Sequence, residues 1–541
     1  MRFGVTPTRT RTQFTYLSLL LAGLLQALSL AWPFEGEAKG LSHGWLQCLS
    51  LAVLAWHLDR VQSKKVAFLQ AWLFSTAWLL GSTWWLFISL HTYGGLAAPL
   101  AASAVFLLAG GLATLYGLAA ALFHQLTHRD IGIWLRVLAF ASVWSLTEML
   151  RGTLWTGFPW GAIGYAHVDG LLRHWSSWGG VYGVSAVAAG LAMFGAAERR
   201  YAPSVRGMWL LQAVTVLMLA FTWYTAPSRD AESVQKSDSP LRVTLLQGNI
   251  AQDLKFGEGV KHALSDYREA LLTSTSDLTV TPETAIPMTP EQMPERYWAE
   301  LESHFSQGKQ AALIGVPLSI RSAFGQRQYS NSVVGYMPQT TPAATASYQY
   351  DKHHLVPFGE FVPPLFQWFV QMLHIPLGDF TRGEVAQPSM TLKGERIAPN
   401  ICYEDLFGEE LARSFASPTH APTILVNVSN IAWFGDTVAI DQHLNISRMR
   451  ALELGRPMLR ATNTGATAII NAQGEVTHRL PSSVKGALTA DVYGVHGPVT
   501  PYAQWVSRYG LWPMVLLAGL ILVVVGAIAY ANRHGPRRFG P

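Results

Sequence analysis

Three short segments of the sequence carry residue types that could transfer an acyl group through a covalent intermediate. They are Thr281–Pro287, which contains Glu283, Tyr350–Pro363, which contains Lys352, and Pro399–Asp405, which contains Cys402. Such chemistry needs a nucleophile, a base and a group that stabilises the developing oxyanion. A cysteine attacks as its thiolate, so a carboxylate base and a nearby cation suit it. Cys402, Glu283 and Lys352 could supply these roles if the fold brings the three segments together.

Each of these residues also has a plainer structural explanation. A lone cysteine is often buried and inert, Glu283 could be an ordinary turn carboxylate, and Lys352 could be a solvated surface charge. Their joint placement after strand-like runs favours the catalytic interpretation. The adjacent pair His353 and His354 resembles metal ligands, but neighbouring residues on a strand point to opposite faces, so we expect neither a metal nor another cofactor.

The three segments lie in a region, 241–495, where short β-rich runs alternate with polar helical stretches. The runs that we expect to be strands are Leu241–Leu246, Leu278–Thr281, Ala312–Val316, Ser332–Tyr336, Ala346–Tyr350, Thr423–Val428 and Ala466–Ile470. This alternation predicts a globular α/β domain. The polar segment Ala231–Pro240 is expected to be the linker that precedes it.

The rest of the 541-residue chain is strongly apolar: half of all residues are hydrophobic and 13% are charged, against roughly 25% in soluble domains. Membrane-spanning helices, which need about 20 mostly apolar residues, are expected at Phe14–Trp32, Ala67–Leu90, Leu96–Phe123, Gly132–Leu150, Ser177–Ala197, Met208–Ala226 and Trp512–Tyr530. A shorter run, Trp45–Leu58, is either a further span or a buried amphipathic helix. Counting it predicts eight spans: seven in a membrane domain, 1–230, and the last at 510–532, after the catalytic domain, 241–495.

Basic residues predict the orientation of these spans. They are Arg2, Arg9 and Arg11; Arg60, Lys64 and Lys65; Arg129; Arg199, Arg200 and Arg206; and Arg533, Arg537 and Arg538. All of them fall on one side if eight helices span. The positive-inside rule then places both termini in the cytoplasm and the α/β domain outside. Because topology accounts for the net charge of +5, no nucleic-acid partner is expected.

The three segments above resemble the nitrilase superfamily, whose members carry a Glu–Lys–Cys triad in an αββα sandwich, and the resemblance extends over 241–495. Together with the membrane helices, the chain resembles the family of bacterial apolipoprotein N-acyltransferases over nearly its whole length. Further motifs similar to that family are Val428–Asp436, Gln442-His443, Arg448–Pro457 and, between two apolar helices, Phe158–Trp160. Ile431 departs from the family pattern, where an acidic residue is more usual, and it leaves the triad untouched.

The resemblance implies a role for each matching residue. Glu283 would deprotonate Cys402, and Lys352 would stabilise the tetrahedral intermediate with the backbone N–H of Tyr403. Glu360 would orient the lysine or the base, while Tyr403 and Glu404 would support the site.

The resemblance also implies a reaction, its partners and its location. Cys402 would take an acyl chain from a membrane phospholipid as a thioester. It would then pass the chain to the amine of a diacylglyceryl-cysteine at an apolipoprotein N-terminus, on the periplasmic side of a bacterial inner membrane.

An unusually apolar segment, Pro364–Phe380, has two interpretations. It is either a core helix or a lid that dips into the bilayer interface, with Trp368 and Phe369 as its contacts with lipid. Trp433 and Phe434 are further candidates for substrate or lid contacts.

Two alternative functions remain open from the sequence. One is a membrane-bound nitrilase-type amidase that hydrolyses a small amide, in which water rather than an amine resolves the thioester. The other is a lipid transporter or binding protein with an inactive nitrilase-like domain. The presence of all three triad residues argues against the second alternative.

Overall fold

The computed structural model describes residues 9–128, 131–201, 235–237, 239–255, 257, 259–321, 327–338, 347–363 and 380–534. Chain contacts divide the protein into two compact units, and each is described by itself. The helical unit comprises Met1–Trp84, Ala102–Pro227 and Leu511–Pro541. The second unit comprises Trp85–Ala101 and Ser228–Gly510, so it takes in a short stretch from the N-terminal half of the sequence.

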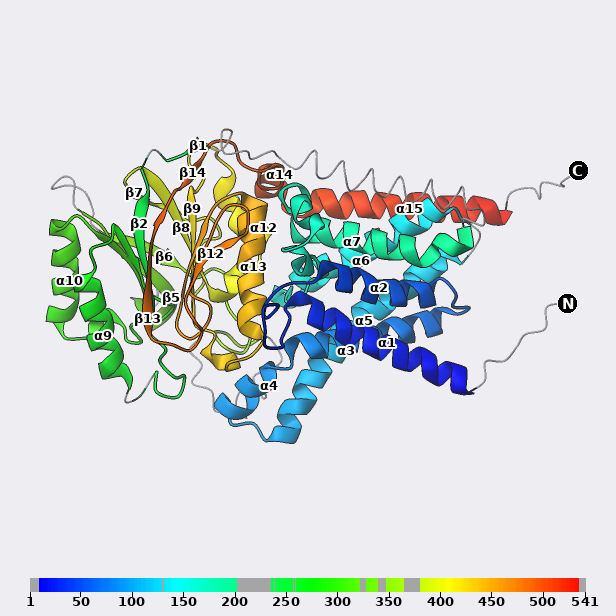
Figure 1. The fold of residues 1–541 in the computed structure, drawn as a ribbon, viewed down its shortest axis with the longest axis horizontal. Helices are drawn as coiled ribbons and strands as arrows, with labels where there is room; N and C mark the ends of the chain where they lie inside the picture. The colour runs from blue at the N-terminus through cyan, green and yellow to red at the C-terminus, as the bar shows by residue number, and fades with distance from the viewer. Residues whose placement is uncertain are drawn as a thin grey trace, which may run out of the picture. The chain divides into compact units, whose positions relative to one another are not determined.

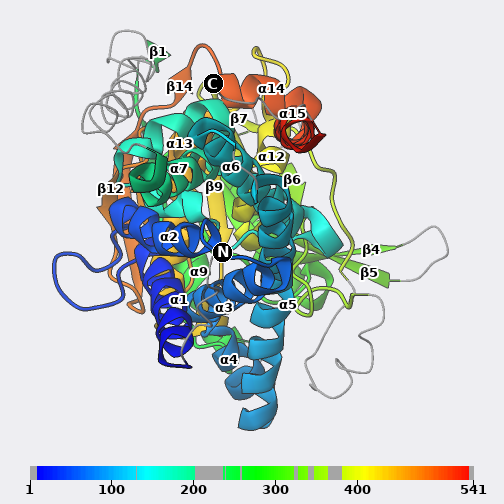
Figure 2. The same cartoon turned by 90° about the vertical axis from the view of Figure 1, so that its right-hand side faces the viewer.

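The helical unit is a bundle whose helices are seen side by side in Figure 1 and end-on in Figure 2. Its helices are α1 (Arg9–Leu30), α2 (Gly44–Leu58), α3 (Lys64–Thr83), α5 (Ala98–Thr127), α6 (Ile133–Thr153), α7 (Ser176–Tyr201) and α15 (Trp512–His534). Within the described residues, six helical segments are long and apolar enough to cross a membrane. Helix α2 has 15 residues and is about 22 Å long, which is shorter than the roughly 30 Å hydrocarbon core. The expected span Met208–Ala226 lies outside the described residues.

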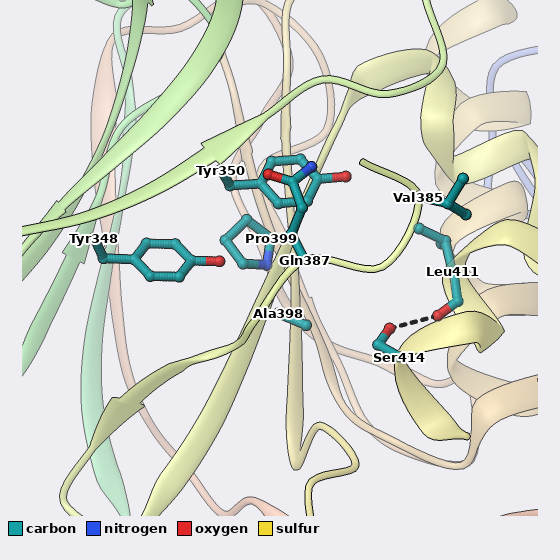
Figure 3. A pocket seen from close by; sticks show the side chains of 8 residues that line it. All are labelled: Tyr348, Tyr350, Val385, Gln387, Ala398, Pro399, Leu411 and Ser414. Carbon is teal, nitrogen blue, oxygen red and sulfur yellow. Dashed lines mark hydrogen bonds between the residues drawn. The ribbon is translucent and has the colours of Figure 1, made fainter. Parts of the chain in front are cut away.

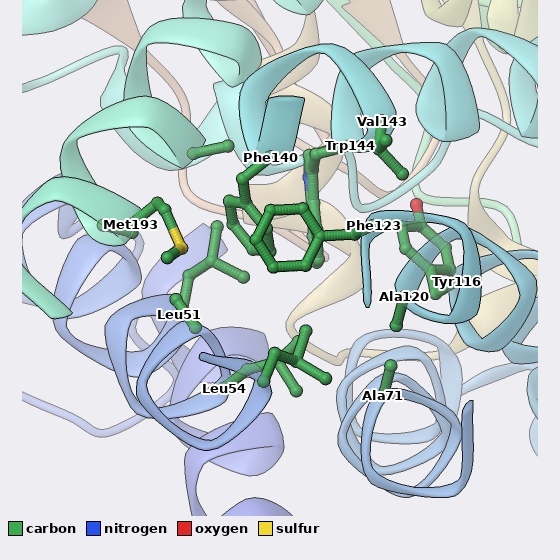
Figure 4. Packing of buried hydrophobic residues seen from close by; sticks show 14 of the residues in the cluster. Leu51, Leu54, Ala71, Tyr116, Ala120, Phe123, Phe140, Val143, Trp144 and Met193 are labelled. Atoms are coloured by element: carbon green, nitrogen blue, oxygen red, sulfur yellow. The ribbon is translucent and has the colours of Figure 1, made fainter. Parts of the chain in front are cut away.

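Aromatic and small side chains fill the interior of this bundle (Figure 4). The ring of Trp78 lies 5.3 Å from Tyr116 and 5.8 Å from Trp144, between centroids. On the outside, helix α15 leaves most of its apolar side chains exposed. A continuous apolar surface of this kind is what contact with lipid requires.

The third apolar run ends earlier than the sequence indicates. Helix α3 ends at Thr83, so the expected helix Ala67–Leu90 is wrong beyond that residue. It is followed by α4 (Leu86–Ile88) and a π-helical turn, η1 (Ser89–Tyr93). These residues pack within the second unit, and hydropathy alone cannot distinguish burial against protein from burial in lipid.

The second unit contains two six-stranded sheets and a two-stranded ribbon. One sheet has the order β13-β2-β3-β4-β5-β6, the other β12-β11-β10-β9-β8-β7, and β1 pairs with β14. The strands are β1 (Gln235–Lys236), β2 (Leu241–Gln247), β3 (Leu278–Val280), β4 (Ala311–Arg321), β5 (Arg327–Tyr336), β6 (Ser347–Asp351), β7 (Met390–Leu392), β8 (Glu395–Ile401), β9 (Ile424–Ser429), β10 (Met458–Thr462), β11 (Ala468–Ile470), β12 (Val476–Arg479), β13 (Gly486–Val492) and β14 (Val495–His496).

Helices cover the outer face of each sheet, which completes an αββα sandwich (Figure 1). Helices α9 (Gly259–Thr273) and α10 (Glu295–Gln307) cover one sheet, and α12 (Gly408–Leu411) and α13 (Ala439–Leu454) the other. Helix α10 turns one apolar face inward because Trp298, Leu301 and Phe305 recur at helical spacing and are buried. The predicted fold class, a helical membrane domain with a nitrilase-like sandwich, is therefore confirmed.

The remaining elements are short. They are η2 (Leu154–Thr156), η3 (Ile163–His167), η4 (Leu171–Trp175), η5 (Pro290–Gln292), η6 (Cys402–Leu406), η7 (Ala412–Phe415), η8 (Ala432–Phe434) and α14 (Pro501–Tyr509). The side chain of Thr500 caps α14 by accepting a hydrogen bond from the Ala503 N–H.

All seven runs expected to be strands contain strand residues, although their ends differ. The sequence did not predict β7, β8, β10, β12 or β13. Strand β8 includes Pro399, which cannot donate to a ladder and is unusual inside a sheet. Strand β1 lies within the segment Ala231–Pro240 that was expected to be only a linker.

Candidate active site

The predicted catalytic residues each lie within three residues of the end of a strand, and they come from both sheets. Glu283 follows β3 and Lys352 follows β6 in one sheet, whereas Cys402 follows β8 in the other. The turn around Glu283 lies against β4, where a Cβ on Gly315 would come within 2.2 Å of the Pro282 carbonyl oxygen. Glycine at this position therefore allows the turn to approach the strand.

A buried lysine lies between two carboxylates. Lys352 Nζ is 3.1 Å from Glu283 Oε1 and 2.9 Å from Glu360 Oε1. Asn331 Nδ2 donates to the same two oxygens at 2.8 and 2.7 Å, and the Asn331 carbonyl accepts the Lys352 N–H at 2.8 Å. Glu360 is anchored by the Val356 N–H, which donates to its Oε2 at 2.8 Å. The carboxylates thus fix the ammonium group in place.

Cys402 begins the 3₁₀ turn η6 with a backbone φ of +54°. This left-handed conformation is strained for a residue with a side chain, and such strain tends to occur at functional sites. Cys402 as a residue is half-buried, and protein surrounds its thiol. The Asn430 N–H donates to Glu283 Oε2 at 2.9 Å, and the same N–H lowers the pKa of the Cys402 thiol. One backbone amide therefore acts on both the carboxylate and the thiol.

The electrostatics of the site favour a neutral thiol beside an ionised carboxylate. Burial raises the pKa of the Cys402 thiol, and the charge of Glu283 raises it further, while Lys352 opposes both. Burial also works against ionisation of Glu283, but Lys352 and Lys255 outweigh it and hold its pKa below the usual value. Glu283 is therefore ready to accept the proton that Cys402 releases on attack.

A second buried lysine contacts the site and was not anticipated. Lys255, which is 5% exposed, donates from Nζ to the backbone carbonyl of Glu283 at 3.1 Å. Burial lowers the pKa of Lys255 to about 8, although the charges of Glu283 and Cys402 work in the opposite direction. The site therefore holds two ammonium groups, of which Lys352 is the one bound by carboxylates.

Glu404 joins the cysteine turn to the segment that carries Lys352. Its two oxygens accept from the Ile401 N–H at 2.6 Å and the Tyr350 hydroxyl at 2.9 Å, and from the N–H groups of His353 and His354 at 2.6 and 3.1 Å. The bond from Ile401 lies within the turn after β8, and the three bonds from Tyr350, His353 and His354 cross from one sheet to the other. Glu404 thereby sets the separation between the nucleophile and the lysine.

A buried polar network lies behind the nucleophile. Arg460 donates from Nη2 to His443 Nδ1 at 3.1 Å, and His443 Nε2 lies 3.3 Å from the Cys402 carbonyl oxygen. Because arginine can only donate, His443 Nδ1 accepts and its Nε2–H donates to Cys402. Burial and Arg460 hold the pKa of His443 well below its usual value, so the ring is neutral. This ring supports the strained turn.

The remaining predicted site residues have varied surroundings. Tyr403 is buried, with its ring 5.3 Å from that of Phe407, and its backbone N–H follows the nucleophile directly. Trp433 and Phe434 lie in η8, directly after Asn430. Trp368 and Phe369 lie outside the described residues.

A small cavity of about 20 Å³ lies near β6 and β8 (Figure 3). It is lined by Tyr348, Tyr350, Val385, Gln387, Ala398, Pro399, Leu411 and Ser414. Its volume would hold about one water molecule, and none of the three predicted catalytic residues lines it. We therefore do not assign it to substrate.

The structure adds partners that the sequence did not predict: Lys255, Asn331, Asn430 and His443. His443 and Asn430 stood in motifs noted from the sequence, without a role assigned to either, whereas Lys255 and Asn331 stood in none. Asn430 contacts Glu283 through its backbone N–H, a group that every residue except proline carries. The residue type at this position therefore could not predict the contact.

Comparison with known proteins identifies the family. Residues 22–194 match the model of the apolipoprotein N-acyltransferase N-terminal domain, and residues 242–494 match that of carbon-nitrogen hydrolases. The apolipoprotein N-acyltransferase of Verminephrobacter eiseniae is 51% identical over 510 residues, covering 91% of this chain and 92% of that protein. The chain belongs to the apolipoprotein N-acyltransferase family. The Ralstonia nicotianae member is 45% identical and covers 91% of this chain and 90% of its own length.

Solved structures that resemble this protein cover about half of the chain. A CN-hydrolase superfamily protein from Xanthomonas campestris is 18% identical, covers 51% of this chain and 96% of its own, and has a TM-score of 0.34. An amidase from Nesterenkonia is 16% identical, covers 51% of this chain and 97% of its own, and has a TM-score of 0.36. Membership of the family rests on the full-length relatives, which as apolipoprotein N-acyltransferases are membrane enzymes.

Proposed function

We propose that this protein transfers a fatty acyl group from a phospholipid to the N-terminal amine of a diacylglyceryl-cysteine in apolipoproteins. The observation that carries the proposal is that Glu283 binds both the Lys352 ammonium and the Asn430 N–H, and that all three groups act on the Cys402 thiol. This arrangement supplies a base, a nucleophile and a cation in one buried site. The family of the chain supports lipid and lipoprotein as substrates, and the two alternative functions are not favoured.

In the first half-reaction, Glu283 takes the Cys402 proton as the sulfur attacks the ester carbonyl of the phospholipid. The charge that develops on the carbonyl oxygen is stabilised by the Lys352 ammonium and the Tyr403 N–H. The carbon–oxygen bond then breaks, and the leaving alkoxide receives the proton from Glu283. The products are a lysophospholipid and an acyl thioester on Cys402.

In the second half-reaction, the neutral amine of the apolipoprotein attacks the thioester carbonyl. Glu283 accepts the proton that the amine loses, the carbon–sulfur bond breaks, and the proton returns to the Cys402 sulfur. Low water activity near the thioester favours the amine as acceptor over hydrolysis. The proposed location is the outer face of a bacterial inner membrane, with both termini in the cytoplasm, as the distribution of basic residues supports.

Turnover of the purified protein tests this proposal directly. Phospholipid with a labelled acyl chain is mixed with a diacylated lipopeptide that has a free amine, and we expect a labelled, N-acylated lipopeptide. Without lipopeptide, the wild-type protein should carry label that neutral hydroxylamine removes. Free fatty acid as the only product would contradict the proposal and favour hydrolysis.

Replacing the nucleophile tests the covalent step. We expect Cys402→Ser to abolish the hydroxylamine-labile label, because the serine hydroxyl lacks an easily reached anionic form. Cys48→Ser is the matched control, since Cys48 lies in helix α2 of the helical unit. Label retained in Cys402→Ser, or lost in Cys48→Ser, would overturn the role given to Cys402.

A further inference from the structure

Residues 85–101, here called the connector, run between α3 and the body of α5 but pack within the catalytic unit. The connector includes α4 and η1. The sequence alone assigns these residues to apolar membrane helices. Their contacts instead lie with the loop that follows β9, which carries the Asn430 amide.

Four interactions join the connector to this loop and to α13. Trp85, 1% exposed, places its ring 4.2 Å from that of Phe434 and donates from Nε1 to Gln442 Oε1 at 3.2 Å. Ser89 donates from Oγ to the Trp433 carbonyl at 2.7 Å. The ring of Tyr93 lies edge-on to Trp433 at 5.8 Å. The connector thus makes both polar and aromatic contacts.

The loop that receives these contacts, 430–435, is called here the amide loop. Asn430 donates its backbone N–H to Glu283, and its side chain bonds to Gln252 at 2.9 Å and Asn463 at 3.0 Å. The loop ends at Gly435, whose φ is +63°. A Cβ there would lie 3.3 Å from the Ile88 side chain of the connector, in a conformation that already favours glycine.

The amide loop is held from two sides. Gln252 and Asn463 fix Asn430 from within the sandwich. Ser89 binds the backbone three residues further on, and Trp85 packs against the side chain four residues further on. Gln442, the partner of Trp85, also directly precedes His443, which donates to the Cys402 carbonyl. The connector therefore contacts both segments that support the catalytic groups.

We propose that the connector positions the catalytic carboxylate and thiol, so that Trp85 and Ser89 are positioning residues for the acyl-transfer site. They act through the amide loop and α13 and touch neither Glu283 nor Cys402 in any of these contacts. This inference rests on the proposed roles of Glu283 and Cys402. It gives the chain between α3 and α5 a part in catalysis besides linking two helices.

The test measures the reactivity of Cys402 in the full-length protein. With Cys48→Ala in every variant, Cys402 is the only cysteine, and iodoacetamide alkylates it with loss of iodide and transfer of the thiol proton to Glu283. In the wild type, we expect this rate to change little across neutral pH, because the base is already ionised. Trp85→Phe with Ser89→Ala removes two hydrogen bonds and keeps an aromatic ring against Phe434.

In the connector variant, we expect iodoacetamide to alkylate Cys402 about tenfold more slowly at pH 7. A loss of this size corresponds to the free energy of one or two hydrogen bonds that align the catalytic groups. The rate in this variant should also rise with pH, as for a thiol without a base. A matched control is Trp72→Phe with Ser82→Ala, which removes an indole donor to the Gly110 carbonyl and a serine donor to the Trp78 carbonyl within the helical unit. This control should stay within about twofold of the parent.

The variant Glu283→Gln distinguishes two cases: a connector that does not position the site, and a Glu283 that is not the base. If Glu283→Gln lowers the rate and the connector variant matches the parent in rate and pH profile, the connector does not position the site. If Glu283→Gln leaves the rate unchanged, the proposed base is itself wrong. A connector variant that merely unfolds is recognised by its thermal unfolding midpoint. The single substitution Ser89→Ala then provides the milder test, with an expected loss of about threefold.

Discussion

At the scale of single residues, the two lysines near Glu283 differ in how their charges are balanced. Burial lowers the pKa of both, but two carboxylates reverse the effect at Lys352 and raise its pKa above the usual value. Lys255 bonds to a backbone carbonyl, and its pKa remains lowered to about 8. Lys352 is therefore charged throughout the working range, whereas Lys255 loses its proton in mildly alkaline solution.

This difference gives Lys255 a distinct effect on stability. Because its pKa is lower in the folded than in the unfolded state, the unfolded state binds more protons between about pH 8 and pH 10.5. The contribution of Lys255 to stability thus rises with pH across that range, and its charge destabilises the fold below it. Lys255→Met, which fills the same space without charge, should raise the thermal unfolding midpoint at pH 7 and have a smaller effect at pH 10.

Unfolding of the detergent-solubilised protein at the two pH values measures this effect. Lys261→Met is a suitable control, since Lys261 lies in α9 away from the buried cluster. A lower midpoint for Lys255→Met than for the wild type at pH 7 would show that the bonds of the ammonium outweigh its burial.

At the scale of elements, the catalytic geometry depends on a junction between the two sheets. Cys402 belongs to a turn after β8, and Lys352 to a segment after β6, so nothing in either sheet alone fixes the distance between them. Glu404 supplies this link by accepting three hydrogen bonds from the Lys352 segment, and a fourth from Ile401 N–H holds it to its own turn. Burial raises the pKa of Glu404 to about 7, while its backbone hydrogen bonds work against this rise.

We expect Glu404→Gln to weaken this junction. Each carboxylate oxygen accepts two donors, so the amide NH₂ of glutamine must face a pair of donors in either orientation. The expected loss is about 2 kcal/mol in unfolding free energy, together with reduced acyl transfer. Tyr350→Phe, which removes one of the four donors, should cost about 1 kcal/mol. The unfolding free energies of the variants and the wild type are compared at pH 8, where Glu404 is ionised. Equal unfolding free energies for Glu404→Gln and the wild type would contradict the role given to Glu404.

At the scale of the whole molecule, membrane topology determines which side of the bilayer the active site faces. The described residues include six helices of sufficient length, and α2 is the uncertain crossing because it has 15 residues. The expected orientation depends on that crossing. If α2 spans, the loop after it is cytoplasmic and the catalytic unit lies on the opposite side.

Labelling with a membrane-impermeant thiol reagent tests this topology. In a chain with Cys48→Ala and Cys402→Ala, two exposed positions are used: Gln62→Cys after α2 and Ser417→Cys in the catalytic unit. We expect Ser417→Cys to react in spheroplasts and Gln62→Cys to react only in inverted vesicles. With the N-terminus in the cytoplasm, loss of the α2 crossing would exchange the two sides, so that Gln62→Cys reacts in spheroplasts and Ser417→Cys, with the active site, only in inverted vesicles. If both positions react from the same side, an even number of spans separates them, and the expected topology between Gln62 and Ser417 is wrong.

The sequence by itself determined the class of fold and the family, and it supplied the proposal for the chemistry of the site. Apolar runs of spanning length and alternating β-rich runs are local patterns, and each reports the burial of its own segment. Residue type likewise fixes what Glu283, Lys352 and Cys402 can do as base, cation and nucleophile. The nitrilase-like sandwich, the helical domain and the family were therefore predictable, whereas the roles of the supporting residues and of the lid stay predictions.

Only the tertiary structure decided which residues surround these groups. Hydropathy indicates that Trp85 is buried but does not indicate that its partners are Phe434 and Gln442. Because hydropathy does not distinguish burial in protein from burial in lipid, the predicted helix continued past Thr83, where α3 ends. The ionised state of Glu283 depends on Lys255 and Lys352, which are close in space and distant in sequence. Electrostatic and packing energies depend on distances through space, and a linear pattern contains no such distances.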